Sequence, residues 1–329
     1  MPKPESKASQ GWVAFDQLLA ARDTRASPWS SRGERELRFD PDFVLLEKLL
    51  AVPIRLGLET NSGMPAKAVD VWLAHELRRA GFQGDEVWPR ATAPRVLPRE
   101  VAMLRDLKGM VAISKQLFAR IDANKVGQGI TGADAKILGK AYEKQVDVVI
   151  AQWARGPELM ISTKRMDSSF SNNALNRIEE SYGDAKNLRG RHPLAATGFL
   201  FVLRSTAFAA KQKSTALRLL DLLEKLAQEP DAYDATSVVV VEWQDPVSGD
   251  VVQEELDDGK SLEVEVKIRR DLIPEALRPE TFLATMIEAV LDRTPINLHE
   301  EVRKRRGQEV PDEEGVTGAF DSTEGQLDV

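Results

Sequence analysis

The sequence predicts an α/β (α+β) protein in which a mixed central sheet is flanked by helices. Two apolar runs, 146–152 and 159–164, are separated by the turn residues 154–157, which is the pattern of a β-hairpin. From there to the C-terminus, helix-like and strand-like segments alternate. That order is typical of a sheet with helices packed on its faces.

The first half of the chain reads mainly as helices. Residues 1–40 are rich in Ser, Arg and Gly and predict an arm that contains one amphipathic helix at 12–21. A helix starting at Asp42 is expected to end before Pro53, because proline interrupts helices. Helical spacing of apolar residues predicts a further helix over 65–80, which ends at Gly81. A proline-rich loop at 85–97 and helices at 98–121 and 133–145 follow.

The second half contains most of the predicted strands. Helices are expected at 172–188, 211–228 and 279–291, and strands at 198–204, 237–244 and 262–268, with 251–256 as a further candidate strand. We divide the chain into an N-terminal arm with helices (1–55), a main domain (56–307) with a helical insertion at about 85–145, and an acidic tail (308–329) expected to be disordered.

The composition excludes several kinds of protein. The 329 residues contain no cysteine and three histidines, which rules out disulfides, a thiol nucleophile and a Cys-ligated metal site. The longest apolar stretches fall far short of the roughly 20 residues that a membrane helix requires. The N-terminus lacks the apolar core of a signal peptide. We therefore expect a cytoplasmic protein without membrane association.

The net charge of −7 belongs entirely to the C-terminal tail. Residues 308–329 hold seven acidic residues and no basic one, so residues 1–307 carry 45 charges of each sign. Between Lys164 and Arg218, ten Lys/Arg face four Asp/Glu, a net charge of +6. An acidic pI therefore does not argue against a polyanionic partner, and this basic segment favours one.

A glycine-rich segment gives no support for a nucleotide cofactor. Residues 127–132 match Gly-x-Gly-x-x-Gly, but the dinucleotide fingerprint requires a preceding strand, whereas the sequence before this segment is helix-like and polar. Thr131 and Asp134 fit better as a capping box that begins the predicted helix 133–145. A phosphate-binding P-loop is also absent.

The predicted hairpin and the helix after it place polar residues near one another. In the second strand, alternation puts Ser162 and Lys164 on one face, and Asp147 stands near the start of the first strand. A carboxylate there can hold Mg²⁺ through oxygen, and an adjacent lysine can orient water and stabilise charge on a phosphate. The next helix carries a polar stripe along its apolar face, formed by Asn173, Arg177, Glu180, Asp184 and Asn187.

These residues resemble the motif of the PD-(D/E)XK nuclease superfamily, which includes many restriction endonucleases. The superfamily pattern is an Asp followed, one hairpin later, by an acid-x-Lys triplet. Here Asp147 is followed by Ser162-Thr163-Lys164, with Ser in place of the usual acid. In some members with Ser-x-Lys the following helix supplies the missing carboxylate, which points to Glu180, with Glu179 as the fallback. Glu76 matches the acid that the opening helix of the family often carries.

The resemblance implies a Mg²⁺-dependent DNA endonuclease of restriction type, acting in defence against foreign DNA. Asp147 and Glu180 would hold the metal, with the Thr163 carbonyl as a third ligand, and Lys164 would position the attacking water. Cleavage of double-stranded DNA would imply a homodimer or a partner protein. The basic residues of the segment are the candidates for phosphate contacts: Arg177, Lys186, Arg189 and Arg191.

Other interpretations remain open at this stage. Each charge could simply cover the surface, Arg177 could pair with Glu180, and the basic end of the helix could serve its dipole. Because Ser162 replaces the acid, the chain could also be a DNA-binding subunit of a multiprotein defence complex that does not cleave. A helical interaction scaffold without any nucleic-acid role is the third hypothesis.

Overall fold

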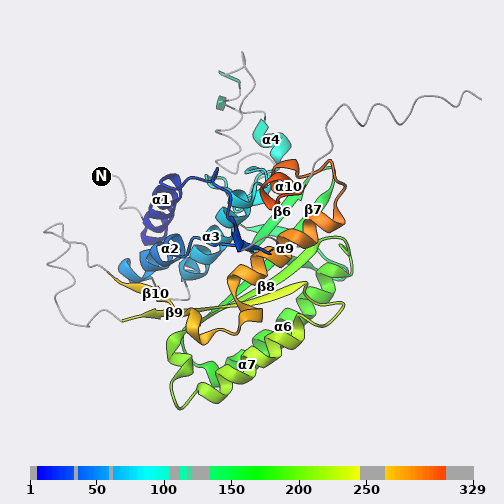
Figure 1. Ribbon diagram of the computed structural model, residues 1–329. Coiled ribbons are helices and arrows are strands. Elements are labelled where there is room, and N and C mark those ends of the chain that lie inside the picture. Colours follow the sequence, from blue (N-terminus) through cyan, green and yellow to red (C-terminus); the bar gives the residue numbers. More distant parts are fainter. Residues whose placement is uncertain are drawn as a thin grey trace, which may run out of the picture.

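A six-stranded mixed sheet forms the centre of the protein, as the sequence predicted. The computed structural model describes residues 6–32, 36–58, 62–103, 134–244 and 264–308, with a few positions between 112 and 119. The strand order is β10-β9-β8-β7-β6-β3, and the sheet curls across the molecule (Figure 1). Two small hairpins, β1–β2 and β4–β5, lie outside this sheet.

The sheet combines a parallel centre with antiparallel edges. Strands β7 (Gly156–Met166), β8 (Ala196–Arg204) and β9 (Ala235–Trp243) run parallel. β6 (Val148–Gln152) pairs antiparallel with β7, which confirms the predicted hairpin. β3 (Val87–Trp88) and β10 (Val266–Ile268) form the antiparallel edges.

Helices cover both faces of the sheet because the strand residues alternate between two cores. One core holds Val148, Ile161 and Leu200 and is covered by α2 (Phe43–Arg55), α3 (Met64–Ala80) and α9 (Pro279–Arg293). The other contains Phe199 and Phe201 and is covered by α6 (Phe170–Arg189) and α7 (Lys213–Leu226). Figure 1 shows α6 and α7 together on one side of the sheet and α3 and α9 on the other.

The N-terminal elements belong to the first core. Phe15 of α1 (Lys7–Ala20) and Leu45 of α2 are fully buried in the same cluster as the strand residues. The sequence missed the hairpin formed by β1 (Trp29–Arg32) and β2 (Glu36–Phe39), because its strands are only four residues long. It also ended α2 too early. Pro53 lies in the last turn of that helix. Its missing N–H removes one backbone hydrogen bond there, and the helix ends two residues later.

The predicted helix 133–145 was wrong. This segment forms an antiparallel hairpin of β4 (Ala135–Leu138) and β5 (Glu143–Val146). Thr131, the first residue of the predicted capping box, lies outside the described residues. The turn of the hairpin makes a close tertiary contact. Gly139 packs so closely against Asn187 of α6 that a Cβ atom would come within 2.2 Å of its side chain.

Several predicted segments lie outside the described residues. They include the glycine-rich segment 127–132, most of the predicted helix 98–121, the candidate strand 251–256 and most of the acidic tail. Within 98–121 the structure describes the short helix α4 (Arg99–Met103). The C-terminal part ends in α10 (Glu300–Arg306). Within the described part of the chain, no helix has both the length and the apolar character needed to cross a membrane.

One glycine provides a direct test of how the sheet packs on α9. A Cβ added to Gly198 of β8 would lie 2.8 Å from Phe282 and 2.9 Å from Met286. We expect Gly198→Ala to lower the free energy of unfolding by about 1–3 kcal/mol through overpacking. A Cβ added to Gly183 of α6 would meet no atom within 4 Å. Gly183→Ala should therefore raise the free energy of unfolding by about 0.5–1 kcal/mol. Urea denaturation measures both, and equal effects would contradict the packing described here.

Candidate active site

Asp147 lies at a bend between β5 and β6, beside the point where the pairing of β6 with β7 ends. The last paired positions there are Val148 and Ile161, so the backbone of Thr163 has no partner on β6. The Thr163 N–H donates instead to Asp147 Oδ2 at 2.8 Å. The carboxylate therefore takes the place of the next strand residue and remains in partial contact with solvent at the sheet edge.

A second carboxylate reaches the same threonine from α3. Asp70 is only 1% exposed, and its Oδ1 accepts a hydrogen bond of 2.6 Å from Thr163 Oγ1. Thr163 thus bridges two carboxylates, one through its backbone and one through its hydroxyl group. Asp70 was not among the residues that the sequence predicted.

A lysine one turn earlier on α3 balances part of this negative charge. Lys67 Nζ lies 3.3 Å from Asp70 Oδ2 and 2.8 Å from Asp134 Oδ1. Burial opposes the charged form of Lys67, but Asp70 and Asp134 outweigh it, and the pKa of Lys67 is raised. Lys67 is therefore a permanent cation beside the two carboxylates.

The two carboxyl groups resist ionisation. Burial and, after it, the nearby charge of Asp147 raise the pKa of Asp70 to about 7, against the opposing effects of Lys67 and Thr163. Burial also raises the pKa of Asp147, against the hydrogen bond from Thr163 and the charge of Lys67. Such a pair gains most from an added cation, because a cation relieves both the desolvation and the mutual repulsion.

The residues present fit a divalent metal ion. Asp70 Oδ2 is buried and accepts no hydrogen bond of regular geometry, and its ion-pair partner Lys67 Nζ lies 3.3 Å away. Asp147 is within electrostatic reach of Asp70 and is partly exposed to solvent. Carboxylate oxygens in a half-hydrated setting are the ligands that Mg²⁺ and Mn²⁺ prefer.

Lys164 and Glu180 meet on the opposite side of the strand. Because neighbouring strand residues point to opposite faces, Thr163 faces α3 while Lys164 faces α6. Lys164 Nζ lies 3.9 Å from Glu180 Oε1, and Arg177 Nη1 lies 3.0 Å from Glu180 Oε2. The charge of Lys164 also reaches Asp147. Asp147 at the sheet edge therefore has one cation on each face, Lys67 and Lys164.

The rest of the predicted polar stripe holds the β4–β5 hairpin. Asn187 Oδ1 accepts from the backbone N–H groups of Ala141 and Tyr142, and Asp184 accepts from the Tyr142 hydroxyl and pairs with Lys144. The stripe is therefore divided between two roles. Its middle meets Lys164, and its C-terminal part fixes the hairpin that leads directly into Asp147.

Glu76 does not join the site, which corrects its assignment as the acid of the opening helix. It is fully buried on another face of α3, where it accepts from the Asp42 N–H at 3.0 Å and pairs with Arg79 at 2.6 Å. Burial raises its pKa to about 7. Asp70, six residues earlier, is the acid of α3 that approaches Asp147.

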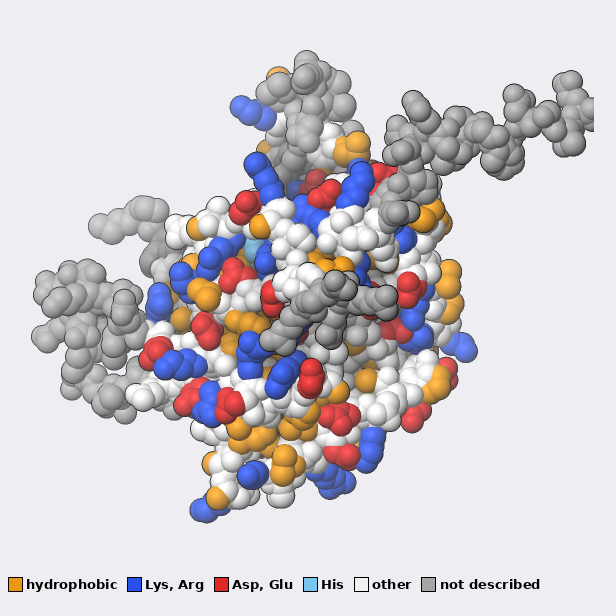
Figure 2. All heavy atoms as spheres, in the orientation of Figure 1, with side chains coloured by type: hydrophobic (Ala, Val, Ile, Leu, Met, Phe, Trp, Pro, Cys, Tyr) orange, Lys and Arg blue, Asp and Glu red, His pale blue; other side chains and the backbone are white. Residues whose placement is uncertain are grey.

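The other predicted positions lie as follows. Ser162 is buried in β7, and Glu179 is exposed on α6. The side chain of Asn173 lies outside the described residues. Of the predicted phosphate contacts, Lys186 pairs with Asp231 at 2.8 Å, Arg189 pairs with Asp234 at 3.1 Å, and Arg191 is exposed. Charges of both signs are intermingled on the face seen in Figure 2.

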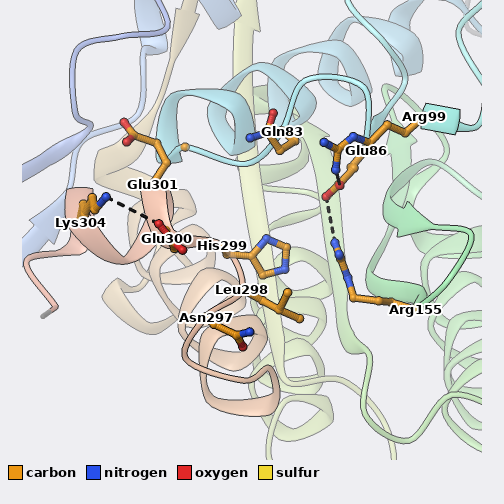
Figure 3. Close-up of a pocket in the computed structure, with 11 residues that line it drawn as sticks. Gln83, Glu86, Arg99, Arg155, Asn297, Leu298, His299, Glu300, Glu301 and Lys304 are labelled. Carbon is orange, nitrogen blue, oxygen red and sulfur yellow. Dashed lines mark hydrogen bonds and ion pairs between the residues drawn. The ribbon is translucent and has the colours of Figure 1, made fainter. Parts of the chain in front are cut away.

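A separate charged cluster lies near the other end of β7. Glu86, Glu158 and His299 bring possible ligand atoms within 4.8 Å of one another, beside a pocket lined by Gln83, Arg99 and Arg155 (Figure 3). This donor set suits a transition metal.

Two arginines, however, already compensate the charge of that cluster. Arg99 pairs with Glu86 at 2.6 Å, and Arg155 pairs with Glu86 at 3.1 Å and with Glu158 at 2.8 Å. His299 Nε2 lies 3.2 Å from Glu158. We therefore interpret the cluster as an ion-pair network that ties the β6–β7 hairpin to the segment before α10.

Comparison with known proteins gives no further guide to the site. No family model matches the chain, and neither a curated protein nor a solved structure does.

The raised pKa of Asp70 predicts a pH-dependent cost to folding. The folded state favours the protonated carboxyl, so stability falls as pH rises from about 4 to about 7, by about 1.4 kcal/mol per unit of pKa difference. Asp70→Asn removes this cost while keeping an acceptor for Thr163. We expect the variant to be more stable than wild type at pH 8, by on the order of 2 kcal/mol, and equally stable near pH 4.

Urea denaturation across this pH range measures the difference. Asp134→Asn is the matched control, because it removes the other carboxylate bonded to Lys67 and should leave the pH profile unchanged. If the stability difference between Asp70→Asn and wild type does not grow between pH 4 and pH 8, Asp70 is not held in a protonated form.

Proposed function

We propose that this protein is a divalent-metal-dependent phosphodiesterase that cleaves DNA, with its site at Asp70, Asp147, Thr163 and Lys164. The observation that carries the proposal is the convergence of two carboxylates with raised pKa values on Thr163, with Lys164 within electrostatic reach of Asp147 from the other face of the strand. Asp147 and Lys164 come from the motif that resembles PD-(D/E)XK nucleases, and Asp70 supplies a carboxylate that the motif itself lacks.

Asp70 and Asp147 would hold the metal ion. Their oxygens are already oriented by the two hydrogen bonds from Thr163, so binding requires little rearrangement of these side chains. When bound, the metal supplies Lewis-acid stabilisation of a phosphate oxygen and lowers the pKa of a coordinated water. Glu180, which the sequence placed among the metal ligands, serves in this proposal to position Lys164.

Lys164 would contact the scissile phosphate and orient the attacking water. Its side chain is 26% exposed and its ammonium group is held near Glu180, so it is both accessible and restrained. A fixed cation beside the phosphate stabilises the negative charge that develops in the transition state. Arg177, 3.0 Å from Glu180, helps keep Glu180 from drawing Lys164 away from the substrate.

DNA is the substrate that the surrounding charge favours. Lys144, Lys164 and Arg177 all lie within electrostatic reach of Glu180, and the segment from Lys164 to Arg218 carries a net charge of +6. Such a surface binds a polyanionic backbone through salt-sensitive phosphate contacts. Assembly as a homodimer or with a partner protein would supply a second site for the second strand.

A plasmid-cleavage assay with Mg²⁺ or Mn²⁺ tests the assignment. We expect Asp70→Asn, Asp147→Asn and Lys164→Ala each to reduce the cleavage rate by about 100-fold or more, because each removes a group that acts on the reacting phosphate. Glu179→Gln, on the exposed side of the same helix as Glu180, should cleave like wild type. Glu180→Gln should have an intermediate effect if Glu180 only positions Lys164.

Cleavage that survives both Asp147→Asn and Lys164→Ala would contradict the proposed site. Salt-sensitive DNA binding without cleavage in any metal would instead favour the non-cleaving DNA-binding subunit, a hypothesis that Ser162 motivates. If the protein neither cleaves nor shifts DNA in a gel at about 50 mM salt, the scaffold hypothesis would be favoured.

A further inference from the structure

A second pocket opens beside the C-terminal end of α3, away from the proposed catalytic residues. Its volume is about 360 Å³. It lies about 12 Å along the helix from Asp70, given a rise of about 1.5 Å per residue. The lining residues come from the end of α3, the loop after it and the start of α4: Arg78, Gln83, Gly84, Asp85, Arg90, Ala91, Thr92, Arg99 and Met103.

Arginine side chains build the wall of this pocket. The loop from Asp85 to Leu97 contains little regular structure, and several of its carbonyl groups accept hydrogen bonds from three guanidinium groups. Arg78 donates to Val87 and Pro89, Arg90 donates to Pro94, and Arg95 donates to Arg90 and Ala91. Hydrogen bonds from arginine side chains therefore hold the loop that forms part of the wall.

Three of the four arginines in this region have a carboxylate partner. Arg90 pairs with Asp85 at 2.7 Å, and Arg95 pairs with Asp16 at 2.7 Å. Arg99 pairs with Glu86 at 2.6 Å, as Figure 3 also shows from the neighbouring pocket. These three pairs are locally neutral.

Arg78 is the exception. It donates to carbonyl oxygens at 3.0 and 2.5 Å, and no carboxylate among the described residues forms an ion pair with it. Its Nε atom is buried and has no hydrogen-bond partner. Burial and the neighbouring charges of Arg90 and Arg95 lower the pKa of Arg78 to about 10, although the charge of Asp85 opposes this shift. A largely desolvated cation with no ion pair of its own is costly, so an anion in the adjacent pocket would be stabilised.

We propose that this pocket binds the phosphate group of a small phosphorylated molecule of about mononucleotide size, with Arg78 as the cation that recognises it. The planar guanidinium group is well suited to phosphate oxygens. The volume exceeds what a phosphate alone fills, and lies in the range of small-molecule sites. Gln83 and Thr92 offer neutral hydrogen bonds, and Ala91 and Met103 offer apolar contact to the organic part.

This inference does not depend on the proposed nuclease activity. The pocket and the Asp70–Asp147 pair share no residue, so either can fail while the other holds. A phosphate in a DNA backbone has the same chemistry as the phosphate of a free nucleotide, and the experiment separates these two sources.

Gly84 allows the pocket to be altered without disturbing the fold. It lines the pocket, and a Cβ atom added there would meet no atom within 4 Å. Gly84→Glu would place a carboxylate where the ligand phosphate is expected, whereas Gly84→Gln adds a side chain of the same size without charge. Arg78→Lys keeps the charge but loses the planar donor set.

Isothermal titration with inorganic phosphate and with a 5′-deoxymononucleotide, at constant ionic strength, tests the proposal. We expect the wild type to bind both, the nucleotide more tightly. Arg78→Lys should weaken binding at least tenfold, and Gly84→Glu should abolish it while Gly84→Gln retains a larger share. Gly84→Glu should also raise the melting temperature above that of Gly84→Gln, because its carboxylate neutralises Arg78.

A short DNA duplex is the second arm of the same experiment. If the duplex binds and this binding is lost in Gly84→Glu, but mononucleotides neither bind nor compete, then the phosphate belongs to DNA and the small-molecule assignment is overturned. If neither phosphate, nucleotide nor duplex distinguishes wild type from Gly84→Glu, the pocket is not a phosphate site. If Gly84→Gln and Gly84→Glu weaken phosphate binding equally, the added charge has no effect, and this result would also contradict the proposed role of charge.

Discussion

The candidate site depends on one residue, Thr163, which holds two carboxylates from distant parts of the chain. Its backbone N–H binds Asp147 and its hydroxyl binds Asp70, which is 93 positions away in sequence. The bridge is possible because β6 stops pairing with β7 at Val148, leaving the Thr163 N–H without a strand partner. The end of a hairpin thus creates both the position for Asp147 and the donor that orients it.

The surrounding elements maintain an arrangement that opposes folding. Two carboxyl groups with raised pKa values cost stability, and the core of α3 and β7 and the cation Lys67 must offset that cost. Asn187 and Asp184 hold the β4–β5 hairpin against α6. The backbone that leads into Asp147 is therefore fixed in position. Strain of this electrostatic kind is common at functional sites, where a bound cation relieves it.

The sequence predicted the central sheet and its hairpin because apolar alternation and turn residues are local signals. It identified Asp147, Lys164 and Glu180, which the structure brings near one another, because they follow that local pattern. It named Glu76 and did not consider Asp70, because helical spacing alone does not say which face of α3 meets β7. The hairpin at 135–146 was missed for a similar reason, since the contacts of its turn with Asn187 and Asp184 of α6 are not visible in the local sequence.

Calorimetric titration with Mn²⁺ tests, without any substrate, whether Asp70 and Asp147 form a divalent-metal site. The measurement is made at pH 6.5 in two buffers of different ionisation enthalpy, which reveals protons released on binding. We predict one ion per chain, bound with proton release because Asp70 is largely protonated at that pH, and lost in both Asp70→Asn and Asp147→Asn but not in Glu179→Gln. Binding that persists unchanged in both Asp variants, or no binding to the wild type, would contradict the account.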